Sequence, residues 1–419
     1  MKRKIIFLVN WSWQLRDYRR FGIELLSKRG FQPEIWDVGI FFESDPDSIT
    51  HPLVSLPHLN HCVFKDVASL GLAIANLQST DCIVSTFAEN GANNQIFNNI
   101  RKIGIPYGIS FLSMEPNDVH TVIDRATSIF FHFVSDWKLF LRRIFRRIGQ
   151  NVQIANDSET LPSFIIVSGK AWTKIHAARK FIVTPYQGKI INAHNYDYDM
   201  TLIGRNENEA PYDFNSKEDY VLFVDQCLPI HFAFYLVDED KENTSRRKSG
   251  ELRESELESL RYCAVDIYYR ELNQFFSEFE SRMGLKIVIA AHPKSTTTIT
   301  NEKFPDREVI FDEINSMVYG ATCVLTHFST AVSFSVIYKK PVLLLDSRNY
   351  HLRCRQKIRR YSKTLGCPII NISSKRKKFF VPKINQKKYD QYFTEFVKHP
   401  NSENTLLWEN FSNYLEKNY

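Results

Sequence analysis

The sequence predicts an α/β protein built from two Rossmann-like domains that face each other across a cleft. Two observations support this prediction. Short apolar runs, which are typical of parallel strands buried on both faces, alternate with helical segments up to residue 205, and the alternation restarts at residue 219. The chain also has 419 residues, which is the length of two ordinary domains. In sheets of this kind, a ligand is expected beyond the carboxyl ends of the strands.

Composition excludes several other classes of protein. Apolar residues make up 43% of the chain and charged residues 24%, which argues against a disordered or fibrous protein. The apolar run at 5–9 is too short for a signal peptide, and no window is apolar enough for a transmembrane helix. The seven cysteines form no CxxC pair, so neither a disulfide framework nor a zinc site is indicated, and a cytoplasmic setting is expected. With only 15 glycines, a glycine-rich nucleotide loop is not expected.

The N-terminal domain is predicted over residues 1–205. Its first strand, at 4–9, is followed by a helix over 15–28 that ends at Gly30, a residue that suits a helix end. The remaining elements are strands at 33–38, 81–86, 107–112, 164–168 and 189–193, and a helix over 94–103.

The second domain is predicted over residues 219–385, after a polar linker that begins at Asn206. Its strands are expected at 220–224, 286–291, 309–311, 323–326 and 342–345, and its helices at 260–282, 314–319 and 330–338. A charged insertion at 238–258 is typical of a surface loop. The tail, 386–419, is predicted to be helical and could cross back to the first domain.

The clearest single pattern is an amphipathic helix over 136–148. Its apolar residues, from Trp137 to Ile148, recur at helical spacing, and Lys and Arg side chains fill the opposite face. Two interpretations stay open: a surface helix packed on the core, or a helix that lies on an anionic membrane. The net charge of +7 favours anionic lipid or glycan over nucleic acid as a partner, because no zinc-finger, RRM or helix-turn-helix signature accompanies it.

Candidate chemistry in the second domain begins at the strand over 286–291. This strand ends in His292, Pro293 and Lys294, and a histidine just past the carboxyl end of a buried parallel strand is expected to face the ligand crevice. His292 could bind a phosphate or leaving group, with Lys294 adding positive charge, or it could simply cap the strand end.

A second motif follows the strand at 323–326. His327, Ser329 and Thr330 stand at the predicted start of a helix, where free backbone N–H groups and the helix dipole favour an anion. Ser329 or Thr330 could equally be an ordinary helix cap. Together with the His-Pro motif, this helix start predicts phosphate binding.

Asp225 ends the first strand of the second domain, in the sequence Val-Asp-Gln-Cys-Leu-Pro. A carboxylate at this crevice-facing position could act as a base, bind a sugar, or attack a sugar as a nucleophile. It could also cap the turn that follows. A separate polar loop at 195–199 carries two carboxylates that could grip a sugar, but no metal-like spacing accompanies them.

A His-Pro motif at a strand end, followed by a Ser/Thr motif at a later helix start, resembles bacterial CMP-sugar-dependent glycosyltransferases of the GT-B type. These include sialyltransferases and the Kdo transferases of capsule and lipopolysaccharide synthesis. The resemblance covers residues 220–346 and implies that His292, Pro293, Ser329 and Thr330 contact the CMP moiety. It further implies a CMP-sugar as donor substrate, with no cofactor and no metal.

Sialyltransferases of this kind often carry an acidic pair followed by glycine in the first domain, where it holds the general base. This chain has no such pair; the nearest candidates are Glu89, in Glu-Asn-Gly, and Glu115, in Glu-Pro. The resemblance therefore leaves open whether Glu89, Glu115 or Asp225 serves the reaction, and whether the transfer retains or inverts the configuration of the sugar.

The function predicted on this basis is transfer of an acidic sugar from a CMP-sugar to a lipid-linked surface polysaccharide, such as a capsule or O-antigen. The acidic sugar would be Kdo, sialic acid or a related nonulosonate. The first domain would bind the acceptor, and the helix at 137–148 would hold the protein on the cytoplasmic face of the inner membrane. Two other functions stay open: a nucleotide-sugar epimerase or hydrolase of the same fold, and a noncatalytic polysaccharide-assembly protein.

Overall fold

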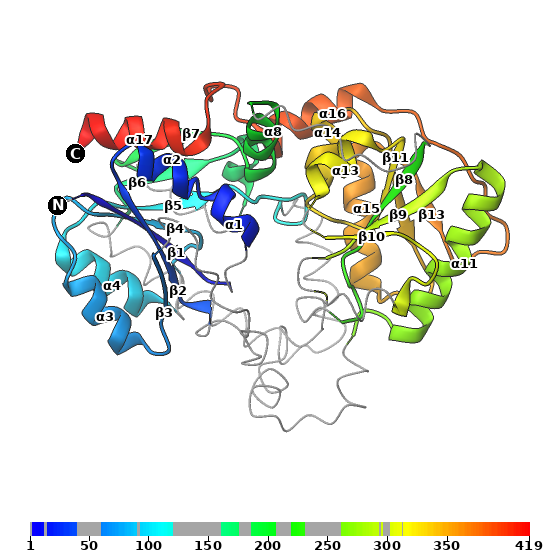
Figure 1. Cartoon of the computed structure of the whole chain (residues 1–419), viewed down its shortest axis with the longest axis horizontal. Helices are drawn as coiled ribbons and strands as arrows, with labels where there is room; N and C mark the ends of the chain where they lie inside the picture. Colours follow the sequence, from blue (N-terminus) through cyan, green and yellow to red (C-terminus); the bar gives the residue numbers. More distant parts are fainter. Residues whose placement is uncertain are drawn as a thin grey trace, which may run out of the picture.

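The computed structural model describes two α/β units that lie side by side (Figure 1). The described residues are 2–11, 15–39, 60–89, 93–119, 161–175, 186–206, 219–230, 261–292, 295, 302–311 and 313–419. The predicted amphipathic helix, the insertion at 238–258, Pro293 and Lys294 lie outside them. None of the helices in the described part of the chain is long and apolar enough to cross a bilayer.

The first unit contains a parallel sheet in the order β3-β2-β1-β4-β5-β6-β7. Its strands are β1 (Lys4–Val9), β2 (Gln32–Asp37), β3 (Asn60–Val63), β4 (Cys82–Ser85), β5 (Tyr107–Phe111), β6 (Phe164–Val167) and β7 (Lys189–Asn192). β3 was not expected from the sequence, because it is a polar edge strand whose side chains are largely accessible. The chain order reverses between β1 and β4, which is where a ligand crevice is expected in such a sheet.

Helices cover both faces of this sheet (Figure 1). α3 (Val67–Ala75) and α4 (Asn94–Ile103) pack against the face that carries Ile6 and Leu8. α1 (Leu15–Arg20), α2 (Ile23–Lys28) and α17 (Leu407–Asn418) lie on the other face.

The single helix predicted over 15–28 is wrong, because the helix breaks at Gly22. Gly22 has a φ of 55°, and a Cβ added there would come within 2.8 Å of the Trp408 ring. The close approach of α17 thus requires a residue without a side chain at this point.

The second unit repeats the same topology in a six-stranded parallel sheet, in the order β10-β9-β8-β11-β12-β13. Its strands are β8 (Tyr220–Val224), β9 (Lys286–Ala290), β10 (Val309–Ile310), β11 (Cys323–Thr326), β12 (Val342–Asp346) and β13 (Ile369–Asn371). Counted in chain order, the second sheet runs 3-2-1-4-5-6, which is the Rossmann order, and the first sheet has this order with a seventh strand added after the sixth. The predicted α/β fold of two Rossmann-like units is confirmed.

The helices of the second unit include one that the sequence did not suggest. They are α11 (Val265–Met283), α13 (Ile314–Gly320), α14 (Val332–Ile337), α15 (Leu352–Leu365) and α16 (Gln386–Tyr392). α15 was not predicted, although its apolar residues Cys354, Ile358, Tyr361 and Leu365 are buried at helical spacing.

The C-terminal residues connect the two units a second time. After α16 and a short π-helix over Phe393–Val397, Lys398 pairs with His194, which follows β7, and α17 then packs on the first sheet. A continuous hydrophobic cluster joins residues of both units, among them Met114 and Trp172 from the first and Phe328 and Val332 from the second. The chain therefore folds as two units held by a shared core and by the returning C-terminal segment.

Candidate functional site

The site in the second unit lies at the carboxyl edge of its sheet, where the strand order reverses between β8 and β11. Phe223 of β8 is level with Leu325 of β11. Asp225 and His327, each two residues further along, therefore emerge next to each other at the ends of adjacent strands. The structure thus brings together two residues that the sequence singled out separately.

A third residue, Tyr268, joins these two side chains. It belongs to the first turn of α11, and its hydroxyl lies 3.3 Å from Oδ1 of Asp225 and 3.1 Å from Nε2 of His327. Tyr268 and His327 are fully buried, whereas Asp225 keeps 3% of its surface exposed. Sequence reasoning missed Tyr268, because a tyrosine on the buried face of a long helix is usually an ordinary core residue.

Burial shifts the pKa values of Asp225 and His327 in opposite directions. Desolvation raises the pKa of Asp225 to about 6, although backbone N–H groups of Cys227 and Gln226 and the Tyr268 hydroxyl oppose the rise. Desolvation lowers the pKa of His327 to about 4, against the opposing effect of its hydrogen bond to the Leu345 carbonyl. Both changes favour the neutral form of the buried group.

The turn after β8 holds Asp225 in a fixed orientation. Its Oδ1 accepts a hydrogen bond from the backbone N–H of Cys227 at 2.9 Å. Cys227 itself has a φ of 53°, a left-handed conformation that is uncommon for a residue with a side chain. The side chain of Gln226 accepts a hydrogen bond from the backbone N–H of Phe328 at 2.8 Å, which ties the ends of β8 and β11 together. Asp225 therefore does cap the following turn, as one interpretation of the sequence held.

The predicted helix start after β11 differs from expectation. The helix begins at Val332 rather than Thr330, and it has only six residues, so the dipole invoked for an anion site is weak. Ser329 caps the turn before it, because its Oγ accepts a hydrogen bond from the backbone N–H of Ala331 at 3.2 Å. Thr330 is exposed. Ser329 and Thr330 follow His327 closely, but they do not stand at the start of a helix long enough for its dipole to favour an anion.

His292 lies at the same edge of the sheet, two residues after the end of β9. Val224 of β8 is level with Ala290 of β9, so His292 stands one position beyond Asp225 on the neighbouring strand. Its side chain is partly accessible, and its carbonyl accepts hydrogen bonds from the backbone and the hydroxyl of Ser295. Four predicted residues, Asp225, His292, His327 and Ser329, thus follow three adjacent strand ends.

Glu115 follows β5 of the first unit and contacts the second unit. The hydroxyl of Tyr361 on α15 donates a hydrogen bond to Oε2 of Glu115. Burial and the neighbouring Asp118 raise the pKa of Glu115, while Tyr361 and Lys357 act in the opposite direction. The ammonium of Lys357 also lies 5.3 Å from the ring centre of Phe328, which follows His327. Lys357 of the second unit thus lies close both to Glu115 and to the residue that follows His327.

Glu89 has a different environment. Both of its carboxylate oxygens accept hydrogen bonds from the guanidinium of Arg101 on α4, at 2.9 and 3.1 Å. In such a bidentate pair, both carboxylate oxygens are already engaged by the guanidinium. The structure therefore gives Glu89 a structural partner within the first unit, whereas Glu115 faces the second.

The segment at 195–199, predicted to be a polar loop, forms the start of a helix, and its two carboxylates have partners within the protein: Asp197 pairs with Arg20, and Asp199 contacts His194. Nε2 of His194 lies 2.9 Å from Oδ1 of Asp199, and the same oxygen accepts the backbone N–H of Leu407 at the start of α17. Oδ1 of Asn195 caps α8 (Tyr196–Asn206), and its amide donates to Ser333 of the second unit. Within the described residues, no group of three or more His, Cys, Asp or Glu side chains could hold a metal ion.

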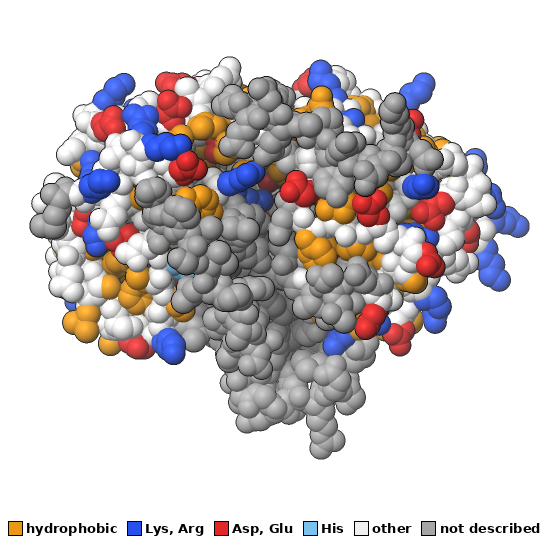
Figure 2. All heavy atoms as spheres, viewed as in Figure 1, with side chains coloured by type: hydrophobic (Ala, Val, Ile, Leu, Met, Phe, Trp, Pro, Cys, Tyr) orange, Lys and Arg blue, Asp and Glu red, His pale blue; other side chains and the backbone are white. Residues whose placement is uncertain are grey.

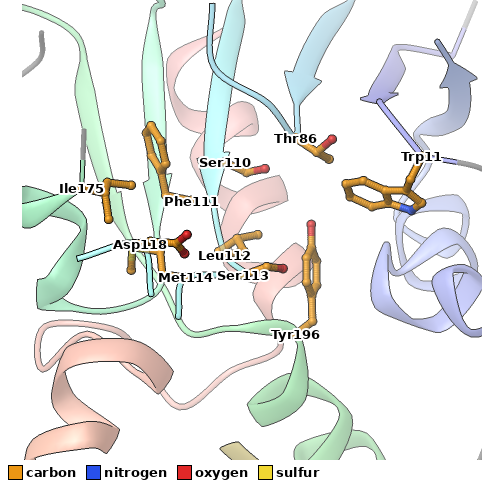
Figure 3. Close-up of a pocket in the computed structure, with 10 residues that line it drawn as sticks. All are labelled: Trp11, Thr86, Ser110, Phe111, Leu112, Ser113, Met114, Asp118, Ile175 and Tyr196. Atoms are coloured by element: carbon orange, nitrogen blue, oxygen red, sulfur yellow. The ribbon is translucent and has the colours of Figure 1, made fainter. Parts of the chain in front are cut away.

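A cavity of about 160 Å³ opens at the carboxyl edge of the first sheet (Figure 3). It is lined by residues that follow β1, β4 and β5, with the aromatic rings of Trp11 and Tyr196 and the carboxylate of Asp118 among them. Ser110, Ser113 and Thr86 add hydroxyl groups to its wall. Aromatic rings beside hydroxyl and carboxylate groups suit a polyhydroxylated ligand.

Charge on the described surface is mixed. Figure 2 shows Lys and Arg side chains over both units, interspersed with Asp and Glu. Residues 348–378 are rich in Lys and Arg, and some of these form ion pairs: Arg355 contacts Asp346, and Lys377 contacts Glu278. The proposed membrane-facing helix at 137–148 lies outside the described residues, so its prediction stands on the sequence alone.

No protein-family model matches the chain, and neither does any curated protein sequence. Several solved structures are similar in overall fold. The H548A variant of the wall teichoic acid polymerase TagF has 12% identity and a TM-score of 0.49, over 99% of this chain and 88% of that chain. UGT2 of Phytolacca americana, complexed with UDP-2fluoro-glucose and pterostilbene, has 14% identity and a TM-score of 0.47, over 100% and 99%. The UDP-GlcNAc 2-epimerase of Methanocaldococcus jannaschii has 12% identity and a TM-score of 0.46, over 100% of both chains.

Proposed function

We propose that this chain is a glycosyltransferase that binds a nucleotide-sugar donor at the carboxyl edge of the second sheet. The supporting observation is the juxtaposition of Asp225 and His327, joined through Tyr268, at the point where the strand order of a Rossmann-like sheet reverses. His292 and Ser329 stand at the neighbouring strand ends, where they would contact the phosphate of the donor.

The donor in this proposal is a CMP-sugar that carries an acidic sugar. This finer assignment rests on the His-Pro and Ser/Thr motifs at His292 and Ser329, which resemble those of CMP-sugar-dependent transferases. Pro293 and Lys294 belong to the same motif. In the reaction, the bond between the anomeric carbon and the phosphate oxygen breaks, and its electron pair leaves with CMP. Donors aimed at that oxygen stabilise the charge that develops there.

The acceptor would bind in the cavity of the first unit, which lies at the corresponding edge of the first sheet. Its hydroxyl oxygen attacks the anomeric carbon, and a base removes the hydroxyl proton. Glu115 suits this role better than Glu89, because Glu115 lies where the two units meet and has a raised pKa, whereas Glu89 is held by Arg101. A carboxylate whose pKa is raised toward neutrality is a more effective general base.

A lipid-linked polysaccharide is the proposed acceptor, with the helix at 137–148 as the membrane contact. The basic and aromatic pattern of that segment supports the proposal. Sedimentation with anionic vesicles, compared with neutral vesicles, tests it. Co-sedimentation with anionic vesicles that is lost when Arg142 and Arg143 are replaced by Ser supports membrane docking. Equal sedimentation of the protein with anionic and with neutral vesicles contradicts it.

Thermal shift with CMP, UDP, GDP and ADP tests the donor assignment, because a ligand that binds the folded state raises its unfolding temperature. CMP is expected to give the largest shift. His292→Ala and Ser329→Ala should reduce that shift, whereas Ser316→Ala, on the exposed side of α13, should not. Preference for UDP would replace the CMP assignment, and release of free sugar or epimer without acceptor would favour a hydrolase or epimerase. Binding of glycan with no response to any nucleotide would favour a noncatalytic protein.

A further inference from the structure

The three side chains at the edge of the second sheet form a line of hydrogen bonds whose direction is fixed at one end. Nδ1 of His327 lies 2.7 Å from the carbonyl oxygen of Leu345. A carbonyl oxygen only accepts hydrogen bonds, so Nδ1 must carry a proton. In a neutral imidazole, Nε2 is then an acceptor, and its partner at 3.1 Å is the hydroxyl of Tyr268.

Tyr268 has a single hydroxyl proton, and two acceptors compete for it. If Tyr268 donates to His327, its oxygen faces Oδ1 of Asp225 at 3.3 Å with a lone pair. An ionised Asp225 has only acceptor oxygens, so this contact would place two acceptors against each other. A protonated Asp225 donates to the Tyr268 oxygen instead, and every contact in the line is then a hydrogen bond.

We propose that Asp225 keeps its proton to a higher pH than an ordinary carboxyl group, because Tyr268 gives its own proton to His327 and accepts the proton of Asp225. Tyr268 and His327 are then positioning residues, which act on the crevice through Asp225. Asp225 is the member of the line that directly follows β8, at the carboxyl edge of the sheet where a ligand would bind.

The surroundings of the line favour neutral forms. Among the described residues, the titratable groups that act electrostatically on the line are thiols and phenols, namely those of Cys227, Cys263, Tyr269 and Tyr350, and the imidazole of His292 follows the neighbouring strand end. Burial raises the pKa of Cys227, Tyr269 and Tyr350, so these groups stay uncharged at neutral pH. The pKa of Asp225, raised to about 6, is higher than that of His327, lowered to about 4, so as the pH falls Asp225 takes up a proton before the imidazole does.

The consequence for chemistry rests on the proposed function, whereas the proton itself can be observed without any substrate. A neutral carboxyl group is neither a nucleophile nor a base. It can donate a hydrogen bond, or its proton, to the phosphate oxygen that departs with CMP, and it then becomes a carboxylate that regains a proton from water. In this protonated form, Asp225 can neither attack the sugar nor abstract a proton, which are two of the three roles that the sequence left open for it.

Infrared spectroscopy of the full chain tests the proposal, because the C=O stretch of a protonated carboxyl group is distinct from that of a carboxylate. The difference between wild type and Asp225→Asn isolates this one carboxyl group at each pH. A protonated band is expected below a midpoint near the value of about 6 given by its burial. Absence of the band at pH 5 would overturn the proposal.

The role of His327 gives a directional test. His327→Phe removes the acceptor that competes for the Tyr268 proton, so Tyr268 can donate to the Asp225 carboxylate. The midpoint of the Asp225 titration is then expected to fall by about one pH unit. The double variant Tyr268→Phe/His327→Phe lacks that donor and should show no such fall. Tyr269→Phe, which removes a hydroxyl from the adjacent residue of α11, is the matched control and should leave the midpoint unchanged. An unchanged midpoint in His327→Phe contradicts the proposal.

The protonation of His327 can also be measured in the wild-type protein, without any substitution at this residue. In wild type with ¹⁵N-labelled histidine, one ring is expected to remain neutral with its proton on Nδ1 down to pH 5. If no ring among the 12 histidines behaves in this way, the assigned direction of the line is wrong. Failure of every nucleotide in the thermal-shift panel, with these results intact, would reject the proposed donor and leave the proton assignment standing.

Discussion

The hydroxyl of Tyr361 on α15 donates a hydrogen bond to the carboxylate of Glu115, and this contact joins the second unit to the loop that follows β5 of the first. Tyr361 is fully buried and Glu115 is half-buried. Arg360, the preceding residue, donates to the backbone carbonyl of Asn117 in the same loop. The loop that carries the candidate base is therefore positioned by the unit that carries the candidate donor site.

Tyr361→Phe is expected to destabilise the protein by about 1–2 kcal/mol at pH 7, because a partly buried carboxylate loses a hydrogen-bond donor. The same change should raise the pKa of Glu115 further, since Tyr361 lowers it. The loss of stability should therefore shrink as the pH falls and Glu115 becomes protonated in both proteins. Thermal unfolding of both proteins between pH 4 and 8 measures this dependence.

Tyr350→Phe is the matched control for that experiment. Tyr350 is also buried, and its hydroxyl has no hydrogen-bond partner among the described residues. Its removal should cost little at any pH, because no hydrogen bond is lost. A loss in Tyr361→Phe that does not vary with pH would indicate that the hydroxyl is not coupled to Glu115.

Asp225→Asn is expected to increase stability at neutral pH. The pKa of Asp225 is raised from 3.8 to about 6, so the unfolded chain releases this proton at a lower pH than the folded protein does. The carboxyl group therefore costs stability that grows as the pH rises from about 4 to about 6 and stays constant above that range. The uncharged amide removes a cost of up to about 3 kcal/mol at pH 7. Denaturant unfolding at several pH values measures it, and equal stability of both proteins at pH 7 would contradict the raised pKa.

The sequence was sufficient to predict the strands of both sheets except β3 and β13, which lie at the edges. β1, β5, β8 and β12 are continuous apolar runs because both faces of a central parallel strand are buried. β3 was missed for the opposite reason, since an edge strand with accessible side chains needs no apolar run. The burial of a central strand can be recognised from its own apolar residues, whereas the pairing of an edge strand depends on neighbours that lie far away in the sequence.

The candidate site was predictable only in part, for a related reason. Asp225 and His327 could be singled out because each directly follows a predicted buried strand. Tyr268 could not, because its role arises only when α11 packs its first turn over both strand ends. The segment at 195–199 was predicted to be a polar loop, but it begins α8. Its side chains cap α8 and α17, and the second of these helices is some 200 residues away in the sequence: Asp199 accepts from Leu407 with a sequence separation of 208.

Trp408→Ala is expected to cost about 3–5 kcal/mol, as for other large buried aromatic residues. Trp408 is 1% exposed, and its ring lies 4.7 Å from that of Phe7 at the centre of the first sheet. Its indole N–H also donates to the carbonyl of Arg20 at the end of α1. Urea unfolding measures the loss. Leu72→Ala serves as control, because Leu72 is 70% exposed on α3 and should change stability by less than about 0.5 kcal/mol. A loss in Trp408→Ala as small as the loss in Leu72→Ala would mean that α17 contributes little to the stability of the first unit.

Ser113→Trp should separate acceptor binding from donor binding. Ser113 is exposed at the wall of the cavity of about 160 Å³, so an indole at this position would occupy the space proposed for the acceptor. Because the proposed donor site lies on the other unit, the thermal shift caused by CMP should be unchanged, while transfer to the acceptor should fall at least about tenfold. Ser79→Trp places the same side chain on an exposed turn of the first unit and is expected to retain both properties. If Ser113→Trp also abolishes the CMP shift, the two ligands do not bind separate units; if transfer persists unchanged, the acceptor does not use this cavity.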